Sequence, residues 1–176
     1  MSSRKRSTKE ILKQNMDRSA PERMQKLIVF LHDIRSLHNV GAVFRNADAF
    51  GIKKIILSGV TPAPPRPEIT KTAIGAEKHV SWQTTDEPVD ALEKIKQKHA
   101  VIGIEQTDTS TLLPDFEIPD RPLCLVFGNE VTGIDELLLP LIDSFVEIPQ
   151  YGHKHSLNVS VATGVVLYGM LEKYWE

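Results

Sequence analysis

The feature that most constrains the fold is a series of short, continuously apolar runs that alternate with helical patterns. The run LIVFL at 27–31 has no polar residue in alternate positions, so a strand made from it must be buried on both faces. Five later runs also read as strands, at 53–59, 79–85, 100–107, 122–128 and 144–150. Strands that alternate with helices predict an α/β domain with a mostly parallel sheet and helices on both faces.

Helical patterns occupy the intervals between these runs. Ser7 and Glu10 have the spacing of a capping box, which predicts a short helix that ends before Pro21. The segment 60–68 holds four prolines and cannot be regular structure. Further helices are predicted at 38–51, 88–99, 134–142 and 157–175. Ligands bind beyond the carboxyl ends of strands in such sheets, so the polar residues that follow the strands are candidates for a site.

Charge is distributed unevenly along the chain. The formal net charge is −2, yet residues 1–26 hold eight basic and three acidic residues, a net charge of +5. The remaining residues, 27–176, therefore carry a net charge of −7. A basic N-terminal arm at 1–26 on an acidic domain at 27–176 is typical of a protein that binds a polyanion. A solvated surface helix explains the same charges equally well.

Length and cysteine content restrict the class of protein. A chain of 176 residues suits one domain with one sizeable core. The single cysteine, Cys124, rules out a disulfide framework and indicates a reducing compartment. No signal peptide and no apolar run of membrane-spanning length is visible, so we expect a cytoplasmic protein without a membrane partner. His153 and His155 have no evident third ligand, and we expect no metal site.

The helix predicted at 38–51 carries polar residues away from its apolar stripe. Arg45 projects about 160° from that stripe if each residue turns the helix by about 100°. Asn39 stands where an N-cap residue would, and Gly51 stands at the C′ position. An ordinary surface helix in which Arg45 pairs with Asp48 would produce the same spacing. The stretch alone therefore leaves both a functional and a structural interpretation open.

Two later stretches also place polar residues after strands. Gly128 ends a strand and would let a ligand approach the backbone closely, and Glu130 could accept hydrogen bonds. Ser156 and Asn158 flank Leu157 at the start of the last helix. Each stretch alone also fits an ordinary turn or a polar helix cap.

Taken together, the stretches form an ordered set of motifs. They read N-x-G-x-x-x-R-x-A-x-x-F-G at 39–51, G-x-E-x-x-G at 128–133 and I-P-x-x-G-x-x-x-S-L-N-V-S-V-A at 148–162. This set resembles the three motifs of the SpoU family of RNA ribose 2′-O-methyltransferases, within the SPOUT superfamily. The resemblance covers about 27–171, and the short basic N-terminal piece is most similar to the TrmH-type tRNA guanosine methyltransferases. Asn129 departs from the Ser or Ala commonly found at its position.

The resemblance implies a SPOUT methyltransferase domain at 27–176 whose C-terminal part forms a trefoil knot. It implies a homodimer, S-adenosylmethionine as the cofactor and no DNA partner. The substrate would be RNA, most closely a D-loop guanosine of tRNA, with rRNA as the alternative. A non-catalytic RNA-binding factor with the same fold, or an enzyme acting on a small molecule, is the rival hypothesis. The residues implied to bind the cofactor are Gly103, Ile104, Glu105, Phe127, Gly128, Ile148 and Leu157.

The resemblance also assigns catalytic roles. The arginine that matches Arg45 is proposed in the family to activate the ribose hydroxyl, but a guanidinium keeps its proton in proteins. Either an RNA phosphate makes Arg45 a base, or Arg45 stays charged, clamps that phosphate and stabilises the developing alkoxide. The second interpretation is favoured on physical grounds. The resemblance implies that Asn39, Glu130, Ser156 and Asn158 hold Arg45 and the motif loops in register.

Overall fold

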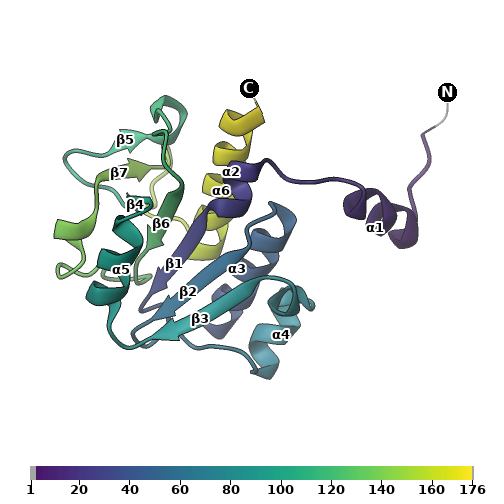
Figure 1. Cartoon of the computed structure of the whole chain (residues 1–176), viewed down its shortest axis with the longest axis horizontal. Coiled ribbons are helices and arrows are strands. Elements are labelled where there is room, and N and C mark those ends of the chain that lie inside the picture. The colour runs from purple at the N-terminus through teal and green to yellow at the C-terminus, as the bar shows by residue number, and fades with distance from the viewer. Residues whose placement is uncertain (1–2, 176) are drawn as a thin grey trace.

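The computed structural model describes residues 3–175, which form one twisted sheet covered by helices (Figure 1). The strand order is β3-β2-β1-β6-β4-β7-β5, and every strand pairing among the described residues is parallel. This confirms the predicted α/β fold, although the two-residue strand β5 was not predicted. The strands are β1 (Ile28–His32), β2 (Lys54–Ser58), β3 (Ser81–Thr85), β4 (Ala100–Ile104), β5 (Thr111–Leu112), β6 (Leu123–Phe127) and β7 (Ser144–Glu147).

Helices occupy most of the connections. The α-helices are α1 (Thr8–Met16), α2 (Glu22–Lys26), α3 (Leu37–Ala49), α4 (Pro67–Ala73), α5 (Pro88–Lys96) and α6 (Val159–Trp175). Single turns of 3₁₀ helix are η1 (Ala76–Lys78), η2 (Leu113–Asp115) and η3 (Leu139–Leu141). Within the part of the chain that the structure describes, no helix has the length and apolar character needed to cross a membrane.

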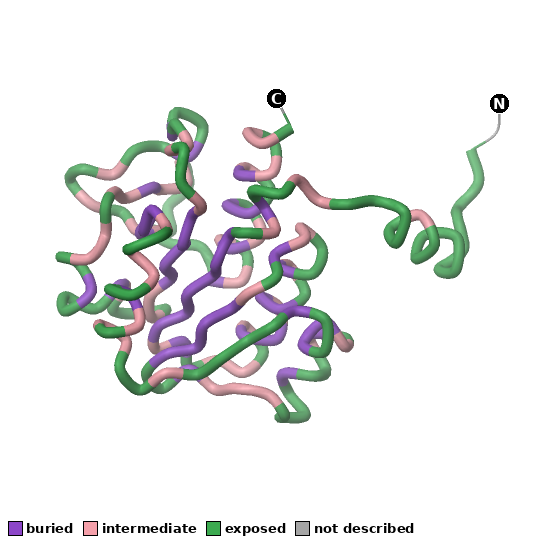
Figure 2. The backbone as a smooth tube through the Cα atoms, in the orientation of Figure 1, coloured by how far each residue is buried: buried purple, intermediate pink, exposed green. Residues whose placement is uncertain are grey.

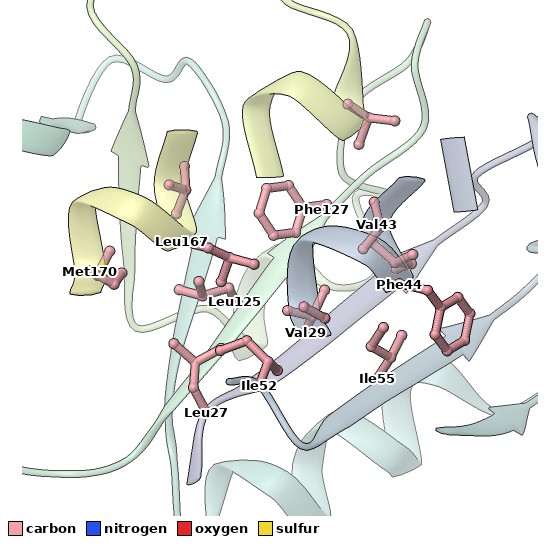
Figure 3. Close-up of a cluster of buried hydrophobic side chains, with 14 of the residues drawn as sticks. Leu27, Val29, Val43, Phe44, Ile52, Ile55, Leu125, Phe127, Leu167 and Met170 are labelled. Atoms are coloured by element: carbon pink, nitrogen blue, oxygen red, sulfur yellow. The ribbon is translucent and has the colours of Figure 1, made fainter. Parts of the chain in front are cut away.

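The side chains of β1 alternate between two hydrophobic cores, one on each face of the sheet. Val29 and Leu31 belong to the larger core, which α3 and α6 cover (Figure 3). Ile28 and Phe30 belong to the smaller core, together with Leu92 of α5. The whole strand is buried (Figure 2), as an apolar run inside a parallel sheet requires. Each large apolar side chain buried in this way stabilises the fold by about 1.5–3 kcal/mol.

The prediction of a helix at 134–142 is wrong, because the only helical structure in this segment is the single 3₁₀ turn η3. The Oδ1 atom of Asp135 accepts a hydrogen bond from the Leu137 amide at 2.8 Å, which closes a local turn instead of an α-helical turn. Pro140 has no amide hydrogen to continue a helix. The apolar spacing nevertheless had a structural cause, since Ile134 and Leu138 are buried in the smaller core.

The ends of α3 differ from the prediction at one position. The N-cap is Ser36, whose hydroxyl accepts a hydrogen bond from the Asn39 amide at 3.3 Å, so the prediction of Asn39 as the cap is wrong. The Asn39 side chain is consequently available for other bonds. Gly51 lies one residue beyond the C-cap with φ +75°, which confirms it at the C′ position.

The order of the strands creates a switch point at the centre of the sheet. From β1 the chain builds outward to β2 and β3, and then crosses through α5 to β4 on the other side. β6 fills the place between β1 and β4. In open α/β sheets, ligands bind beyond the carboxyl ends of the strands at such a switch point. The last helix, α6, returns to pack against α3. The trefoil knot stays a prediction.

The N-terminal helix α1 projects away from the rest of the molecule (Figures 1 and 2). It has no buried residue, and its predicted capping box between Ser7 and Glu10 is formed. α2, by contrast, packs on the domain. Met24 is fully buried, and the guanidinium of Arg23 lies 5.8 Å from the centre of the Tyr174 ring.

Candidate active site

A cavity of about 330 Å³ lies beyond the carboxyl ends of β4, β6 and β7. Its wall combines apolar side chains with the polar residues that follow the strands. Gly103 was expected there, but it lies buried within β4, where an added Cβ would be 2.7 Å from the Phe145 ring. The other six residues predicted to bind the cofactor do line the cavity: Ile104, Glu105, Phe127, Gly128, Ile148 and Leu157.

The loop at 128–134 forms one side of the cavity and is closed by its own backbone. The Asn129 amide donates to the Gly133 carbonyl at 2.9 Å, and the Gly133 amide donates back to the Asn129 carbonyl at 3.0 Å. The Asn129 side chain accepts from the Val131 amide at 2.9 Å and donates to the Asp33 carbonyl at 2.7 Å. The loop is thereby tied to the end of β1.

Gly128 is required by this loop for a reason that the sequence did not suggest. An added Cβ would lie 2.3 Å from the carbonyl carbon and oxygen of Gly133 and 2.4 Å from the Ile134 nitrogen. Its first clash would therefore be with the protein's own backbone, whereas the sequence suggested that the glycine makes room for a ligand. Glu105 also holds the end of this loop, because its Oε2 atom accepts a hydrogen bond from the Ile134 amide at 3.2 Å.

A chain of hydrogen bonds joins the three motifs at the edge of the cavity. The Asn158 side-chain amide donates to Asn39 Oδ1 at 3.0 Å, and Asn39 Nδ2 donates to Glu130 Oε1 at 3.0 Å. The other carboxylate oxygen of Glu130 accepts from the Arg35 backbone amide at 3.3 Å. Three of the five predicted catalytic residues are thus brought together by segments far apart in the sequence.

Glu130 is held in its ionised form. Burial by itself would raise the pKa of this carboxyl, but hydrogen bonds from the Asn39 side chain and from the Arg35 and Ser36 backbone amides outweigh burial and lower the pKa. An ionised carboxylate only accepts hydrogen bonds. It therefore orients the Asn39 amide group, whose oxygen is left to accept from Asn158.

Arg45 and Ser156 lie outside this chain of hydrogen bonds. Arg45 is exposed on α3, and within residues 3–175 it forms no side-chain hydrogen bond and no ion pair, including with Asp48. Ser156 is exposed and lines the cavity. Asn39, Glu130 and Asn158 bond to one another and, within the part of the chain that the structure describes, not to Arg45.

Three side chains to which the sequence analysis assigned no role also position the site. Asn46 of α3 donates to the Ser160 carbonyl of α6 at 2.7 Å, and Gln106 donates to the His155 carbonyl at 2.7 Å. Asn129 ties its loop to β1, as described above. Gln106 and Asn129 shortly follow strands, which was an available signal. The sequence around Asn46 offered no such signal, because the residue that Asn46 bonds to is 114 residues away in the sequence.

Known proteins share both the sequence pattern and the fold. The tRNA (guanosine(18)-2′-O)-methyltransferase of Aquifex aeolicus is 32% identical over 160 residues, which cover 84% of this chain and 69% of that protein. The solved AdoMet-bound rRNA methyltransferase of Sinorhizobium meliloti has a TM-score of 0.77 at 26% identity, covering 89% of this chain and 61% of that one. A relative from Staphylococcus haemolyticus is 28% identical over 83% of this chain, which spans only 58% of that relative's length.

The match to a family model is more extensive than any single motif. The model of the SpoU rRNA Methylase family matches residues 26–168. That range contains all seven strands and all three motifs, so it includes both the sheet and the cavity. The family resemblance predicted from the motifs is confirmed, and the chain belongs to the SpoU rRNA methylase family.

Proposed function

We propose that the protein is an S-adenosylmethionine-dependent RNA ribose 2′-O-methyltransferase that acts on tRNA, with rRNA as the second candidate. The observation that carries this proposal is the hydrogen-bonded chain from Asn158 through Asn39 to Glu130, which joins the three motifs beside the cavity. Polar groups held in fixed directions are what a reaction that develops charge requires. The relatives named as tRNA and rRNA methyltransferases support both candidate substrates.

The cavity suits a nucleoside-bearing cofactor. Its volume of about 330 Å³ lies within the range of small-molecule sites. Phe127, Ile148 and Leu157 offer apolar surface for an adenine ring, and Glu105 and Gln106 offer polar groups for a ribose. S-adenosylmethionine bound there would supply an electrophilic methyl group. The AdoMet-bound relative from Sinorhizobium meliloti supports this assignment.

Arg45 is proposed to act on the RNA. A ribose 2′-hydroxyl attacks a methyl group efficiently only when it is positioned in line and loses its proton. Arg45 would clamp an RNA phosphate with its two-pronged guanidinium and stabilise the developing alkoxide, while water or the phosphate takes the proton. Its exposure on α3, without a partner among residues 3–175, supports a contact with a second molecule. Asn39, Glu130 and Asn158 would hold the loops around it, and Ser156 would contact substrate or cofactor at the cavity.

A homodimer through α6 is a further part of the proposal. Four apolar or aromatic side chains of α6 are exposed: Val161 (51%), Val165 (39%), Tyr168 (48%) and Trp175 (72%). Their spacing of three, four and seven residues aligns them on one side of the helix. A second subunit would remove this apolar stripe from water.

The basic arm is proposed to contact RNA phosphates. α1 buries none of its residues, so its lysines do not serve the packing of the domain. Lysine and arginine contacts to phosphates release counterions and make binding depend on salt.

An RNA substrate and the single, buried cysteine Cys124 also support a cytoplasmic location.

The decisive experiment incubates the full chain with labelled S-adenosylmethionine and total RNA from cells that lack the protein. We expect label in 2′-O-methylated nucleosides of tRNA, whereas label in rRNA would favour the second candidate. Binding of cofactor and RNA without methyl transfer would instead indicate a non-catalytic factor and overturn the proposal. A chain that lacks residues 1–20 should bind RNA more weakly and with a smaller salt dependence. Unchanged affinity and salt dependence would remove the arm from the RNA contact.

A further inference from the structure

Three side chains of metal-ligand type converge at the end of β1, outside the residues that line the cavity. His32 is the last residue of β1, Asp33 follows it, and Asp135 lies two residues beyond Gly133. His32 Nε2 is 3.6 Å from Asp33 Oδ2 and 4.0 Å from Asp135 Oδ2. The three ligand atoms lie within 4.8 Å of one another. The His32 side chain is only 7% exposed, so this is a partly buried cluster.

The hydrogen bonds of His32 determine which ring nitrogen is available. The Ser58 hydroxyl lies 3.3 Å from the Leu31 carbonyl oxygen and donates its hydrogen to it. His32 Nδ1 lies 2.8 Å from Ser58 Oγ and forms a hydrogen bond with it. Nδ1 is therefore occupied, and Nε2 is the ring nitrogen that faces the two carboxylates. A hydrogen bond of this kind, at the nitrogen remote from the ion, orients metal-binding histidines.

One oxygen of each carboxylate is turned toward His32 Nε2. Asp33 Oδ1 accepts from the Val60 amide at 2.9 Å, and Asp135 Oδ1 accepts from the Leu137 amide at 2.8 Å. In each case Oδ2 is the oxygen near His32. Nε2 lies 3.6 and 4.0 Å from these oxygens, and both distances exceed the usual N–H···O length of about 2.7–3.2 Å. Three atoms of metal-ligand type thus face one another without a hydrogen bond of normal length between the imidazole and either carboxylate.

The backbone is also held in an unusual conformation to make this arrangement. Asp33 has φ +56°, in the left-handed region that residues other than glycine seldom adopt. Its carbonyl accepts the Asn129 side-chain hydrogen bond at 2.7 Å. Gly59 faces the carboxylate so closely that an added Cβ would lie 1.9 Å from Asp33 Oδ1. Several elements therefore combine to fix one carboxylate in place.

We propose that His32, Asp33 and Asp135 bind one divalent transition-metal ion such as Zn²⁺ or Mn²⁺. One imidazole nitrogen and two carboxylate oxygens suit these ions, whereas Mg²⁺ and Ca²⁺ prefer oxygen ligands alone. Metal–ligand bonds of about 2.0–2.2 Å require the three side chains to close by less than about 1 Å. The bound ion ties β1 to the segment that follows Gly133, and so braces the loop beside the cavity. This site does not depend on the methyl-transfer proposal.

Calorimetry on the full chain, first stripped of metal with a chelator, tests this site with ZnCl₂ and MnCl₂ separately. We expect one ion per chain. Asp135→Asn should weaken binding by about 10–100-fold or more, the range seen when groups around a bound metal are lost. Asp33→Asn should do the same, and asparagine tolerates the left-handed backbone there. Glu136→Gln, a change of the exposed neighbouring carboxylate, should bind like the wild type.

A second readout identifies the ligand directly. Zn²⁺ should shift the ring-nitrogen NMR signals of one histidine, His32, among the six in the chain. Absence of saturable binding by both ions would overturn the proposal. So would unchanged affinity in folded Asp135→Asn and Asp33→Asn, or a Zn²⁺-induced shift confined to His153 and His155. If either variant fails to fold, the other variant and the wild-type NMR signals decide.

Discussion

A single carboxylate determines the direction in which the hydrogen bonds of the candidate site are donated. Ionised Glu130 can only accept hydrogen bonds, so Asn39 must present its NH₂ group to it and its oxygen to Asn158. Asn158 Oδ1 in turn accepts from the Ser160 amide at 2.9 Å, near the start of α6. At the residue scale, the identities of these side chains were predicted from the motifs, and their partners follow from charge and hydrogen-bond direction.

Arg45 is the residue whose replacement should affect the reaction with least effect on the fold. Arg45→Ala should fold and bind cofactor nearly normally, because the side chain is exposed. Methyl transfer should fall by about 10²–10³-fold, the usual effect of losing one preorganised transition-state donor. Arg45→Lys should also lose most activity, since lysine lacks the planar, two-pronged contact. Single-turnover rates at saturating RNA measure this, with exposed Arg66→Ala as the control. A near-wild-type rate for Arg45→Ala would remove the assignment.

Glu130 should make the protein sensitive to acid. Its pKa is lowered in the folded state, so its contribution to stability is present above the unfolded pKa of about 4.3 and is lost as pH falls through the folded value. Glu130→Gln cannot titrate, and its melting temperature should fall less steeply than that of the wild type in this acid range. Thermal unfolding from neutral pH to about pH 3 measures the difference. Glu136→Gln should follow the wild-type curve, and an equally steep fall in Glu130→Gln would contradict the assignment.

At the element scale, local sequence accounts for most of the structure. The strands other than β5, and the helices near 38–51, 88–99 and 157–175, were predicted because apolar runs and helical spacing depend on neighbouring residues. The segment 134–142 was mistaken for a helix, since its apolar residues fit the helical period. Side-chain hydrogen bonding and a proline decided that conformation, and hydrophobic spacing does not report either one.

The loop after β6 should be sensitive to a single methyl group. Gly128→Ala would place a Cβ 2.3 Å from the Gly133 backbone, and we expect a loss of about 1–3 kcal/mol of unfolding free energy. Gly152→Ala is the matched control, because no atom lies within 4 Å of its added Cβ. Chemical denaturation of both variants measures the difference. Equal stability of the two variants would show that the loop can move aside without cost.

At the scale of the whole molecule, the exposed stripe on α6 should govern assembly. Val165→Glu would place a charge in the proposed dimer contact and should give a monomer, because a buried unpaired charge is costly. Val60→Glu, at another exposed valine, should leave the dimer intact. Sedimentation at micromolar protein distinguishes the two. A wild-type chain that sediments as a monomer would contradict the proposed dimer itself.

The sequence by itself determined the parallel α/β sheet, the helix that carries Arg45 and the three motifs, since each depends on residues close together in the chain. Only the tertiary structure decided that Asn39, Glu130 and Asn158 bond to one another, and that Gly103 stays out of the cavity. It alone brought Asp135 to His32 and Asp33. The physical reason is that contacts between distant segments are set by strand order and loop packing, to which no local pattern corresponds.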